Sequence, residues 1–557
     1  MPDDRVKALD ELFDRQRRYV KDPWSVYPIF LRPCSVKILM VTDQGATFGV
    51  GNFGLKALLD TLAVPPGPWV RFDVTKAHRR TDPSADLQQF RFDAHDLSGY
   101  DQIWLFGVER AGSEITETEL RDIARFMDDG GGVFATGDHE DLGVALCGRV
   151  PRVRSMRKWY WPNPGPNGEP VAPKTDGPNR LDTLSPGNDP GVQFDDQSDD
   201  VPQCITPRLY SAWPWSPYFH RAHPHPLLCG PRGIIRVLPD HPHEGECYEP
   251  ADLSATFTFD GYQTTEYPGG VAPEVIAWST IHCGRTAADV KGVLNPRTFG
   301  AIGAFDGHRG AVGRVVVDAT WHHFFDINLV GELGNPDPVK QVGFAATAAG
   351  NAAYQDIQAY YRNIAVWLAR TTTQRCMWWR ALWWTRWHHR IAMDLRPPYL
   401  TGATSLDLGE LIRIGGEARD VLGLVASRCT VRRWLLWEVL RPRFPHIWKE
   451  LVAVLDPWHP RPPLPDPPPV RFGQPDPDLA LGLHGEVLVD AVLGAAVYGV
   501  AAKFGEPGEE ARSEAEETDF GAVIADHVEH AVRLAARHAL HEAEELRKFG
   551  GSLRAPE

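Results

Sequence analysis

Three short segments of this chain place imidazole and carboxylate groups directly after predicted strands. They begin at residue 138, at residue 241 and at residue 318. Histidine and carboxylate side chains are the groups that proteins use for proton transfer and for binding metal ions. The candidate side chains are Asp138, His139, Glu140, His243, Glu244, His322 and His323. The sequence therefore offers three places for general acid–base chemistry.

The first segment lies in a tight turn. Residues 130–136 read Gly-Gly-Gly-Val-Phe-Ala-Thr, which is typical of a buried strand, and Gly137 and Gly143 bracket the turn that follows. Open α/β sheets carry reactive side chains at such a strand-to-helix turn, commonly a Ser or Cys nucleophile. Here the turn presents Asp138 and His139 instead. A site is therefore predicted at this turn, without the usual nucleophile.

Each segment also has a purely structural interpretation. An Asp or His directly after a strand often caps the next helix or satisfies loose backbone groups. The pattern His-x-His-Glu at 241–244 is not HExxH and has no fixed ligand spacing on a helix. Binding of a divalent metal therefore stays an open alternative. If all three segments follow strands of one parallel sheet, their turns meet at one edge and can share a pocket.

Alternating strands and helices position these segments. The expected strands are 36–42, 70–74, 100–107, 130–136, 233–238, 254–259, 274–278 and 313–319, and the expected helices among them are 55–62, 116–129 and 345–370. This alternation predicts an α/β fold with a doubly wound, mostly parallel sheet. A glycine-spaced loop at 49–54 lacks the Lys-Ser/Thr of a P-loop and misses the dinucleotide-binding spacing, so no cofactor-binding residue is assigned.

Composition divides the chain into five parts. They are an N-terminal helical extension at 1–34, the α/β domain at 35–370 with a loop insertion at 162–202, a Trp/Arg-rich helical region at 371–456, a Pro-rich linker at 457–478 and a C-terminal helical hairpin at 479–557. The hairpin helices are expected at about 480–503 and 519–549. The insertion is either a lid over a site or plain surface structure. Stacking of Trp on Arg, inside the helical region or at a protein interface, is the expected use of the Trp/Arg-rich segment.

Charge and cysteine usage limit the class of protein. The net charge of −15 disfavours a general nucleic-acid binder. Eight scattered cysteines without a C-x-x-C favour buried thiols in a reducing cytoplasm over disulfides or structural zinc. The charged N-terminus does not look like a signal peptide. Because no run of about 20 uncharged apolar residues is present, no membrane span is expected.

The strand order, the glycine-rich strand 130–136 with its turn, and residues 275–278 followed by 313–322 resemble the class I glutamine amidotransferase-like superfamily. The ThuA-like (trehalose utilisation) branch is the most similar, and the likeness covers roughly residues 35–370 in pattern. The resemblance implies a flavodoxin-like, class I amidotransferase-like sheet, a cysteine nucleophile at the turn, and an activating histidine near the last strand. His322 or its neighbour His323 occupies that histidine position. Asp138 and His139 stand where the cysteine is expected, so we expect no glutaminase activity.

Two functions are compatible with these residues. In the first, the chain is a hydrolase or lyase acting on a small polar substrate, with His139 and His322 as general acid and base. Asp138 or Glu140 would orient them or direct a water, and residues 243–244 would line the same pocket. In the second, the α/β domain is a non-catalytic ligand-sensing or scaffolding module, and the C-terminal helices bind partner proteins. A small-molecule ligand is thus expected in both, with neither nucleic acid nor a membrane as partner.

Overall fold

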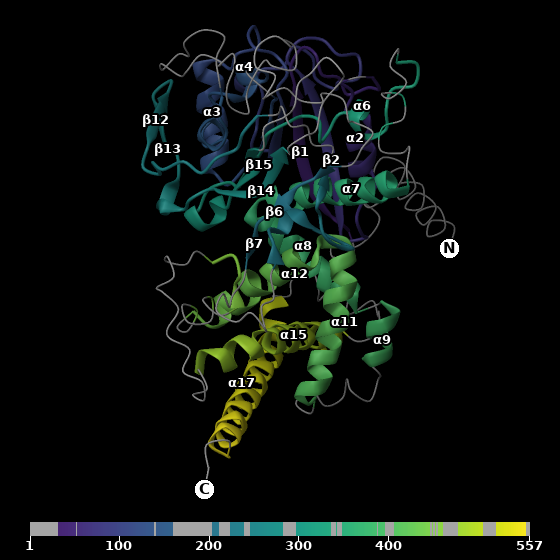
Figure 1. Ribbon diagram of the computed structural model, residues 1–557, viewed down its shortest axis with the longest axis vertical. Coiled ribbons are helices and arrows are strands. Elements are labelled where there is room, and N and C mark those ends of the chain that lie inside the picture. The colour runs from purple at the N-terminus through teal and green to yellow at the C-terminus, as the bar shows by residue number, and fades with distance from the viewer. Residues whose placement is uncertain are drawn as a thin grey trace, which may run out of the picture.

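The computed structural model describes most of the chain. The described residues are 32–51, 53–138, 141–159, 203–210, 223–238, 245–281, 297–335, 341, 343, 348–386, 388–395, 406–445, 448, 452, 455–459, 477–504 and 520–552. The expected N-terminal helix, the insertion at 162–202 and nearly all of the Pro-rich linker lie outside them. Within the described part, the α/β elements form one half of the molecule and the later helices form the other (Figure 1).

An eight-stranded, mostly parallel sheet forms the centre of the α/β half (Figure 1). Its strands are β1 (Cys34–Thr42), β2 (Val70–His78), β3 (Gln102–Phe106), β4 (Gly132–Thr136), β6 (Thr206–Pro207), β14 (Glu274–Ile281), β15 (Arg297–Phe305) and β16 (Val315–Asp318). They lie in the order β2-β1-β3-β4-β16-β15-β14-β6. The first five pair in parallel, and the last three join by antiparallel pairing. The predicted α/β class with a mostly parallel sheet is confirmed.

Helices cover both faces of this sheet. They are α2 (Lys56–Ala63), α3 (Glu117–Asp128), α4 (Val144–Cys147), α5 (Val153–Met156), α6 (Asp326–Leu329) and α7 (Ala348–Leu368). Side chains alternate along a strand, and in β1 Ile38 and Met40 share a buried cluster with α2 and α7. The intervening Leu39 and Val41 share another with α3, α4 and α5. The sheet is therefore buried on both sides, as parallel strands require.

Two expected strands lie outside the main sheet. Residues 233–238 form β10 (Gly233–Ile234) and β11 (Val237–Leu238), which pair with β9 (Cys229–Gly230) and β5 (Gln203–Cys204) in separate two-stranded sheets. Other small pairs are the hairpin of β12 (Thr256–Phe259) with β13 (Tyr262–Thr265), and β7 (Leu209–Tyr210) with β8 (His223–Pro224). Residues 233–238 therefore do not belong to the central sheet, so the condition that all three segments follow strands of one parallel sheet is not met. A short apolar run is compatible with local pairing as well as with a central strand, because its pattern does not name its partner.

The helices after residue 370 form the second half. They are α8 (Thr371–Thr385), α9 (His389–Asp394), α11 (Leu408–Ala426), α12 (Arg428–Trp434), the π-helix η10 (Leu435–Leu440), α13 (Arg441–Arg443), α15 (Pro477–Phe504) and α17 (Phe520–Ser552). Helix α15 packs against both α11 and α17. A Cβ on Gly494 of α15 would lie 2.0 Å from the backbone oxygen of Leu411, so the two helices cross in close contact. Helices α15 and α17 begin and end within a few residues of the predicted bounds.

One stretch of α15, residues 485–503, is long and apolar enough to cross a membrane by length and composition. In this structure 78% of its most apolar window is buried against the rest of the chain. A helix that is apolar on all sides is also what the core of a large soluble protein contains. Its contacts with α11 and α17 account for that composition within the helical half.

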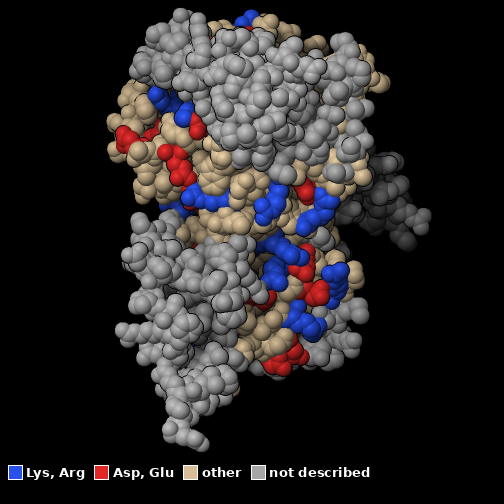
Figure 2. All heavy atoms as spheres, viewed as in Figure 1, with Lys and Arg blue, Asp and Glu red and all other residues tan. Residues whose placement is uncertain are grey.

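Trp and Arg side chains stack inside the helical half, as the sequence predicts. The guanidinium of Arg386 lies 3.7 Å from the ring centre of Trp383, and that of Arg441 lies 4.5 Å from Trp437. Trp378 is fully buried. Figure 2 shows Lys and Arg side chains gathered along the junction between the two halves, in the area of β7, α12 and α11. The Trp-rich segment is therefore mainly core, with arginines packed on its rings.

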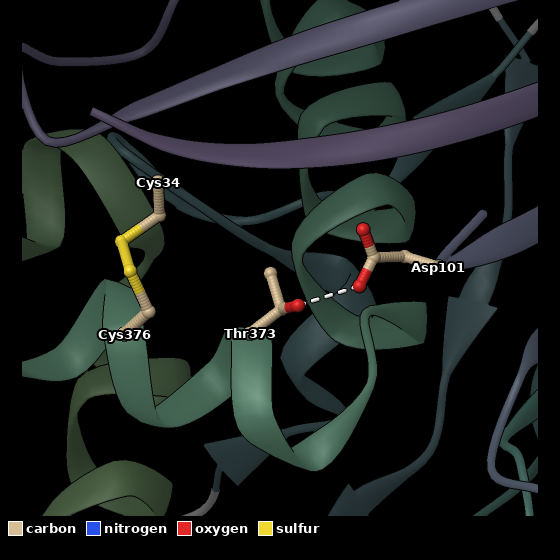
Figure 3. Close-up of a disulfide and its surroundings, with 4 residues drawn as sticks. All are labelled: Cys34, Asp101, Thr373 and Cys376. Atoms are coloured by element: carbon tan, nitrogen blue, oxygen red, sulfur yellow. Dashed lines mark hydrogen bonds between the residues drawn. A yellow bond between two sulfur atoms is a disulfide. The ribbon is translucent and has the colours of Figure 1, made fainter. Parts of the chain in front are cut away.

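A disulfide joins the two halves. It links Cys34, at the start of β1, to Cys376 on α8, across a sequence separation of 342 residues (Figure 3). Beside it, the Asp101 carboxylate accepts a hydrogen bond from the Thr373 hydroxyl (Figure 3). It also accepts one from the backbone N–H of Lys37. The expectation of thiols in place of disulfides is wrong for this pair, because scattered spacing carries no signal for so distant a partner. Disulfides are typical of oxidising compartments, so this pair does not support the expected cytoplasmic location.

Candidate functional site

Three of the candidate side chains lie among the described residues: Asp138, His322 and His323. The other four, His139, Glu140, His243 and Glu244, lie outside them. Asp138 comes two residues after the end of β4, and His322 comes four residues after the end of β16. Strands β4 and β16 are parallel neighbours, so their carboxyl ends meet at one edge of the sheet.

The turn after β4 is held by its backbone and by glycines. The N–H of Asp138 donates to the carbonyl of Leu142 at 3.2 Å, which closes the turn. Gly143 has φ of +88° in the left-handed region, and a Cβ there would lie 2.7 Å from the carbonyl oxygen of Gly107 at the end of β3. Only glycine combines that φ with so close an approach. The turn therefore fixes the carboxylate of Asp138 at the sheet edge, where the residue is 1% exposed.

Asp138 and His322 face each other across the two strand ends. Oδ2 of Asp138 lies 3.5 Å from Nε2 of His322. Oδ1 of Asp138 accepts a hydrogen bond of 3.1 Å from the Thr320 hydroxyl. The same hydroxyl oxygen accepts the backbone N–H of His322 at 3.0 Å. Thr320 thus ties the carboxylate and the imidazole loop to each other.

Asn328 holds the other ring nitrogen of His322. Its Oδ1 lies 3.2 Å from Nδ1 of the imidazole. Because an amide oxygen only accepts hydrogen bonds, Nδ1 carries the hydrogen in this contact. Nε2 then faces the carboxylate of Asp138, and their contact is attractive when one of the two carries a proton. The pair is therefore arranged to hold one exchangeable proton.

The loop that carries His322 is anchored to the N-terminus of α2. Asp326, the first residue of α6, accepts the backbone N–H of Ala57 at 2.8 Å and donates its own N–H to the carbonyl of Gly54 at 2.8 Å. Burial raises the pKa of Asp326 to about 6. A Cβ on Gly54 would lie 2.5 Å from the carbonyl oxygen of Gly49. The glycine-spaced loop therefore permits a close backbone contact that positions α6 and, through it, Asn328.

Arg157 is a residue that the sequence analysis missed. Its Nη2 donates to the backbone carbonyls of Asp138 and of Ala319, the latter at 3.0 Å, and so bridges the ends of β4 and β16. The residue is fully buried, and its guanidinium lies 4.2 Å from the ring centre of Trp159. Burial lowers the pKa of Arg157. An isolated arginine after the short helix α5 carries no sequence pattern that marks this role.

The residue that follows the second candidate segment contacts the end of β16. Gly245, the first described residue after His243 and Glu244, donates its N–H to the carbonyl of Ala319 at 3.2 Å. A Cβ on Gly245 would lie 2.0 Å from Nη2 of Arg157. Gly245 thus contacts the end of β16, whereas the described residues before the segment, 233–238, belong to separate two-stranded sheets.

His323 belongs to a different network. The residue is fully buried, and its Nδ1 lies 2.9 Å from Oδ1 of Asp318. Tyr360 of α7 donates its hydroxyl to Oδ2 of Asp318 at 2.9 Å, and Tyr361 donates to the carbonyl of His323. These contacts attach the end of β16 to α7. Of the two neighbouring histidines, His322 is the one that the structure brings to Asp138.

The nearby thiols are not activated. Sγ of Cys147 lies 3.5 Å from the carbonyl oxygen of Thr136, and Sγ of Cys247 lies 3.4 Å from that of Val317. Burial raises the pKa of both thiols far above their usual range. A nucleophilic cysteine needs the opposite, a stabilised thiolate.

Asp43, at the end of β1, is a second buried carboxyl group at this edge of the sheet. It accepts the backbone N–H groups of Val108 and Glu109 at 2.9 Å each, and it is fully buried. Burial raises the pKa of Asp43 to about 8. Asp43 therefore carries its proton at neutral pH and joins the end of β1 to the end of β3.

Metal ligands do not cluster in the part of the chain that the structure describes. No group of three or more His, Cys, Asp or Glu side chains there could hold an ion. What the described residues build at this edge is a carboxylate–imidazole pair, positioned by a threonine, an asparagine and a buried arginine. Compared with known proteins, the chain matches no family model and has no significant match among curated proteins.

Proposed function

We propose that this chain is an enzyme, a hydrolase or lyase that acts on a small polar substrate through Asp138 and His322. The observation that carries the proposal is the 3.5 Å approach of the carboxylate Oδ2 to Nε2 at two adjacent strand ends. A carboxylate, an imidazole and a group that orients the imidazole are the parts of a general acid–base site. Here Asn328 is the orienting group.

The proposed mechanism gives the transferred proton a direction. At 3.5 Å the contact between Nε2 of His322 and Asp138 is longer than a charge-assisted hydrogen bond, which measures about 2.7–2.9 Å. In the proposed mechanism, Nε2 accepts a proton from a water or a substrate hydroxyl that binds beside the carboxylate. Asp138 then stabilises the imidazolium ion, while Asn328 keeps the ring in place. In the reverse step, the imidazolium returns the proton to a leaving group.

The four candidate residues outside the described part are included in the proposal because the residues next to them in the sequence are described at this edge of the sheet. His139 and Glu140 follow Asp138 directly in the turn. His243 and Glu244 directly precede a glycine whose N–H binds the backbone at the end of β16. We include these side chains in the proposed site because of those neighbouring residues.

Thiol chemistry is not part of the proposal. The turn that would carry a cysteine nucleophile carries Asp138, and Cys147 and Cys247 are buried with raised pKa values. Glutaminase activity of the class I amidotransferase type depends on a reactive thiolate. We therefore propose a hydrolytic or lyase reaction that uses His322 and not a cysteine.

The fold assignment remains part of this proposal. The parallel strands follow the spatial order β2-β1-β3-β4-β16, which corresponds to the 2-1-3-4-5 order of flavodoxin-like sheets. The acidic turn follows the fourth strand of that order, and His322 follows the fifth. This placement supports a flavodoxin-like, class I amidotransferase-like domain related to the ThuA-like branch.

A non-catalytic role is the second candidate, and one observation favours it. Cavities of about 580 Å³ and 390 Å³ lie between the α/β half and the helical half. The side chain of His322 is only 16% exposed, and that of Asp138 only 1%. In this alternative the α/β domain senses a small ligand, and the C-terminal helices contact partner proteins.

Turnover by a single-residue variant distinguishes the enzymatic role from the ligand-sensing role. Wild-type protein is assayed against a panel of small esters, amides, lactones and hydroxy acids, with products followed by NMR. His322→Gln should lower kcat/KM about 100-fold or more on any substrate that turns over, because general acid–base catalysis contributes at least that factor. His389→Gln, at an exposed histidine of α9, is the matched control and should match wild type.

The fold of each variant is checked by circular dichroism and thermal unfolding. Full turnover by a folded His322→Gln protein would contradict the proposed mechanism. Absence of turnover by wild type across the whole panel would favour the ligand-sensing role.

A further inference from the structure

A cavity of about 580 Å³ lies at the junction of the two halves, at the opposite end of β16 from His322. Arg314, one residue before β16, and Trp367, near the end of α7, form its wall on the α/β side. Helices α8, α12, η10 and α13 form the helical side. The volume is within the range of small-molecule sites, about 300–1,000 Å³. This cavity is thus separate from the proposed catalytic pair.

Aromatic rings and guanidinium groups dominate its lining. The tryptophans are Trp367, Trp434, Trp437 and Trp448, and the arginines are Arg314, Arg375, Arg433 and Arg441. Guanidinium groups lie over rings: Arg314 is 4.7 Å from the centre of Trp367, and Arg441 is 4.5 Å from that of Trp437. Flat rings and planar cations together suit a flat ligand that carries negative charge.

Positive charge exceeds negative charge around the cavity. Arg314 and Arg433 share a single carboxylate, Asp306, and Arg375 pairs with Glu438 at 3.1 Å. Four guanidinium groups therefore face two carboxylates, which leaves an excess of two positive charges among these described residues. Burial lowers the pKa of Arg314 to about 10, which is the direction expected when buried charge is incompletely compensated.

Some hydrogen-bond donors of the lining residues are buried without an acceptor. Nε of Arg433 and Nε1 of Trp367 and of Trp437 are buried and have no hydrogen-bond partner within the described structure. Arg433 and Trp367 are 8% and 2% exposed. These atoms have almost no accessible surface, so they do not face the open part of the cavity. The excess of positive charge is therefore the observation that points to an anion.

We propose that this cavity binds a small aromatic anion, a flat ring that carries a carboxylate or a phosphate group. The ring lies among the tryptophans and planar guanidinium groups. The anionic oxygens neutralise the arginine excess. The site is distinct from Asp138 and His322, and its occupancy does not depend on turnover there.

Binding of simple probes to the full-length protein tests this site. Isothermal titration calorimetry is performed with 2-naphthoate and with 2-naphthyl phosphate, which distinguish the two anionic groups. The uncharged 2-naphthamide and inorganic phosphate are the controls for the ring and for the charge. At least one naphthyl anion should bind ten times or more tightly than both controls.

Two substitutions should change the affinity in opposite directions. Arg441→Gln, at an exposed arginine on the rim, should weaken binding of the preferred anion about tenfold by removing one cation. Glu438→Gln should strengthen it, because the excess of positive charge rises. Arg428→Gln is the matched control, since Arg428 is likewise an exposed arginine of the helical half but lines the other cavity, and it should leave the affinity unchanged.

Several results would overturn the proposal. They are equal binding of 2-naphthamide and the naphthyl anions, no binding of either anion at millimolar concentration, or an affinity that neither Arg441→Gln nor Glu438→Gln alters. An equal loss of affinity in Arg428→Gln would indicate general attraction to a basic surface and would also refute the site. Thermal unfolding of each variant shows that the comparison is made on folded protein.

Discussion

Replacement of Asp43 by Asn should remove a large pH dependence from the stability of this protein. Asp43 is fully buried at the end of β1, and burial raises its pKa from 3.8 to about 8. A pKa change of one unit corresponds to about 1.4 kcal/mol of free energy. The shift of Asp43 therefore corresponds to a loss of roughly 6 kcal/mol in folding free energy when the group is ionised and not protonated.

The sign of the change in unfolding free energy with pH follows from proton binding. Below about pH 4 both the folded and unfolded states hold the proton of Asp43, so burial of the neutral group carries no ionisation penalty. Between about pH 4 and pH 8 the unfolded state releases that proton while the folded state keeps it. The free energy of unfolding then falls by about 1.4 kcal/mol for each pH unit, and the loss is complete once pH has passed the folded-state pKa.

Urea unfolding followed by Trp fluorescence at pH 5, 7 and 9 measures this effect. Asparagine stays neutral and keeps an oxygen to accept the N–H groups of Val108 and Glu109. The free energy of unfolding of Asp43→Asn, minus that of wild type, should therefore rise by several kcal/mol from pH 5 to pH 9. The same difference for Asp60→Asn, at an exposed carboxylate of α2, is the control and should stay constant. A flat difference for Asp43→Asn, within about 1 kcal/mol, would refute the burial argument.

Three further experiments test contacts that stabilise the fold. Arg157→Met should lower the free energy of unfolding by about 2–5 kcal/mol in urea, because two buried strand-end carbonyls lose their donor; an unchanged value would exclude the bridging role. Reduction of the Cys34–Cys376 disulfide should lower the stability of wild type by about 2–4 kcal/mol, measured as a drop in Tm with dithiothreitol, and a Cys34→Ser, Cys376→Ser double variant should show no such drop. Gly494→Ala should cost about 1–3 kcal/mol by forcing α15 away from α11, whereas Gly416→Ala, which meets open space on α11, should be neutral or stabilising. Equal effects of the two glycine variants would contradict the close helix crossing.

The parallel half of the sheet could be predicted from the sequence because its strands are continuous apolar runs that alternate with helices. The turn at 137–143 could be located for a related reason, since glycine spacing and acidic residues mark a strand end. The direction in which a side chain points was harder to predict from the sequence. Neighbouring His322 and His323 look equivalent in the sequence, but only the fold turns one toward Asp138 and the other toward α7.

The features that the sequence did not reveal depend on long-range contacts. The disulfide partner of Cys34 lies 342 residues away, and no local spacing identifies it. The role of Arg157 depends on two carbonyls from separate strands. The pairing of the short strands at 233–238 could not be predicted for the same reason, because an apolar run does not show which strand it pairs with.

A double-mutant cycle in turnover tests the central claim, that Asp138 and His322 act as one unit. The variants are Asp138→Asn, His322→Gln and the double substitution, assayed on any substrate from the panel that wild type turns over. Each single variant should lower kcat/KM by about 10²–10³, and the double variant should be no worse than the more damaged single variant, because residues that act together lose their function together. Losses that multiply in the double variant, or wild-type activity in either single variant, would contradict the account.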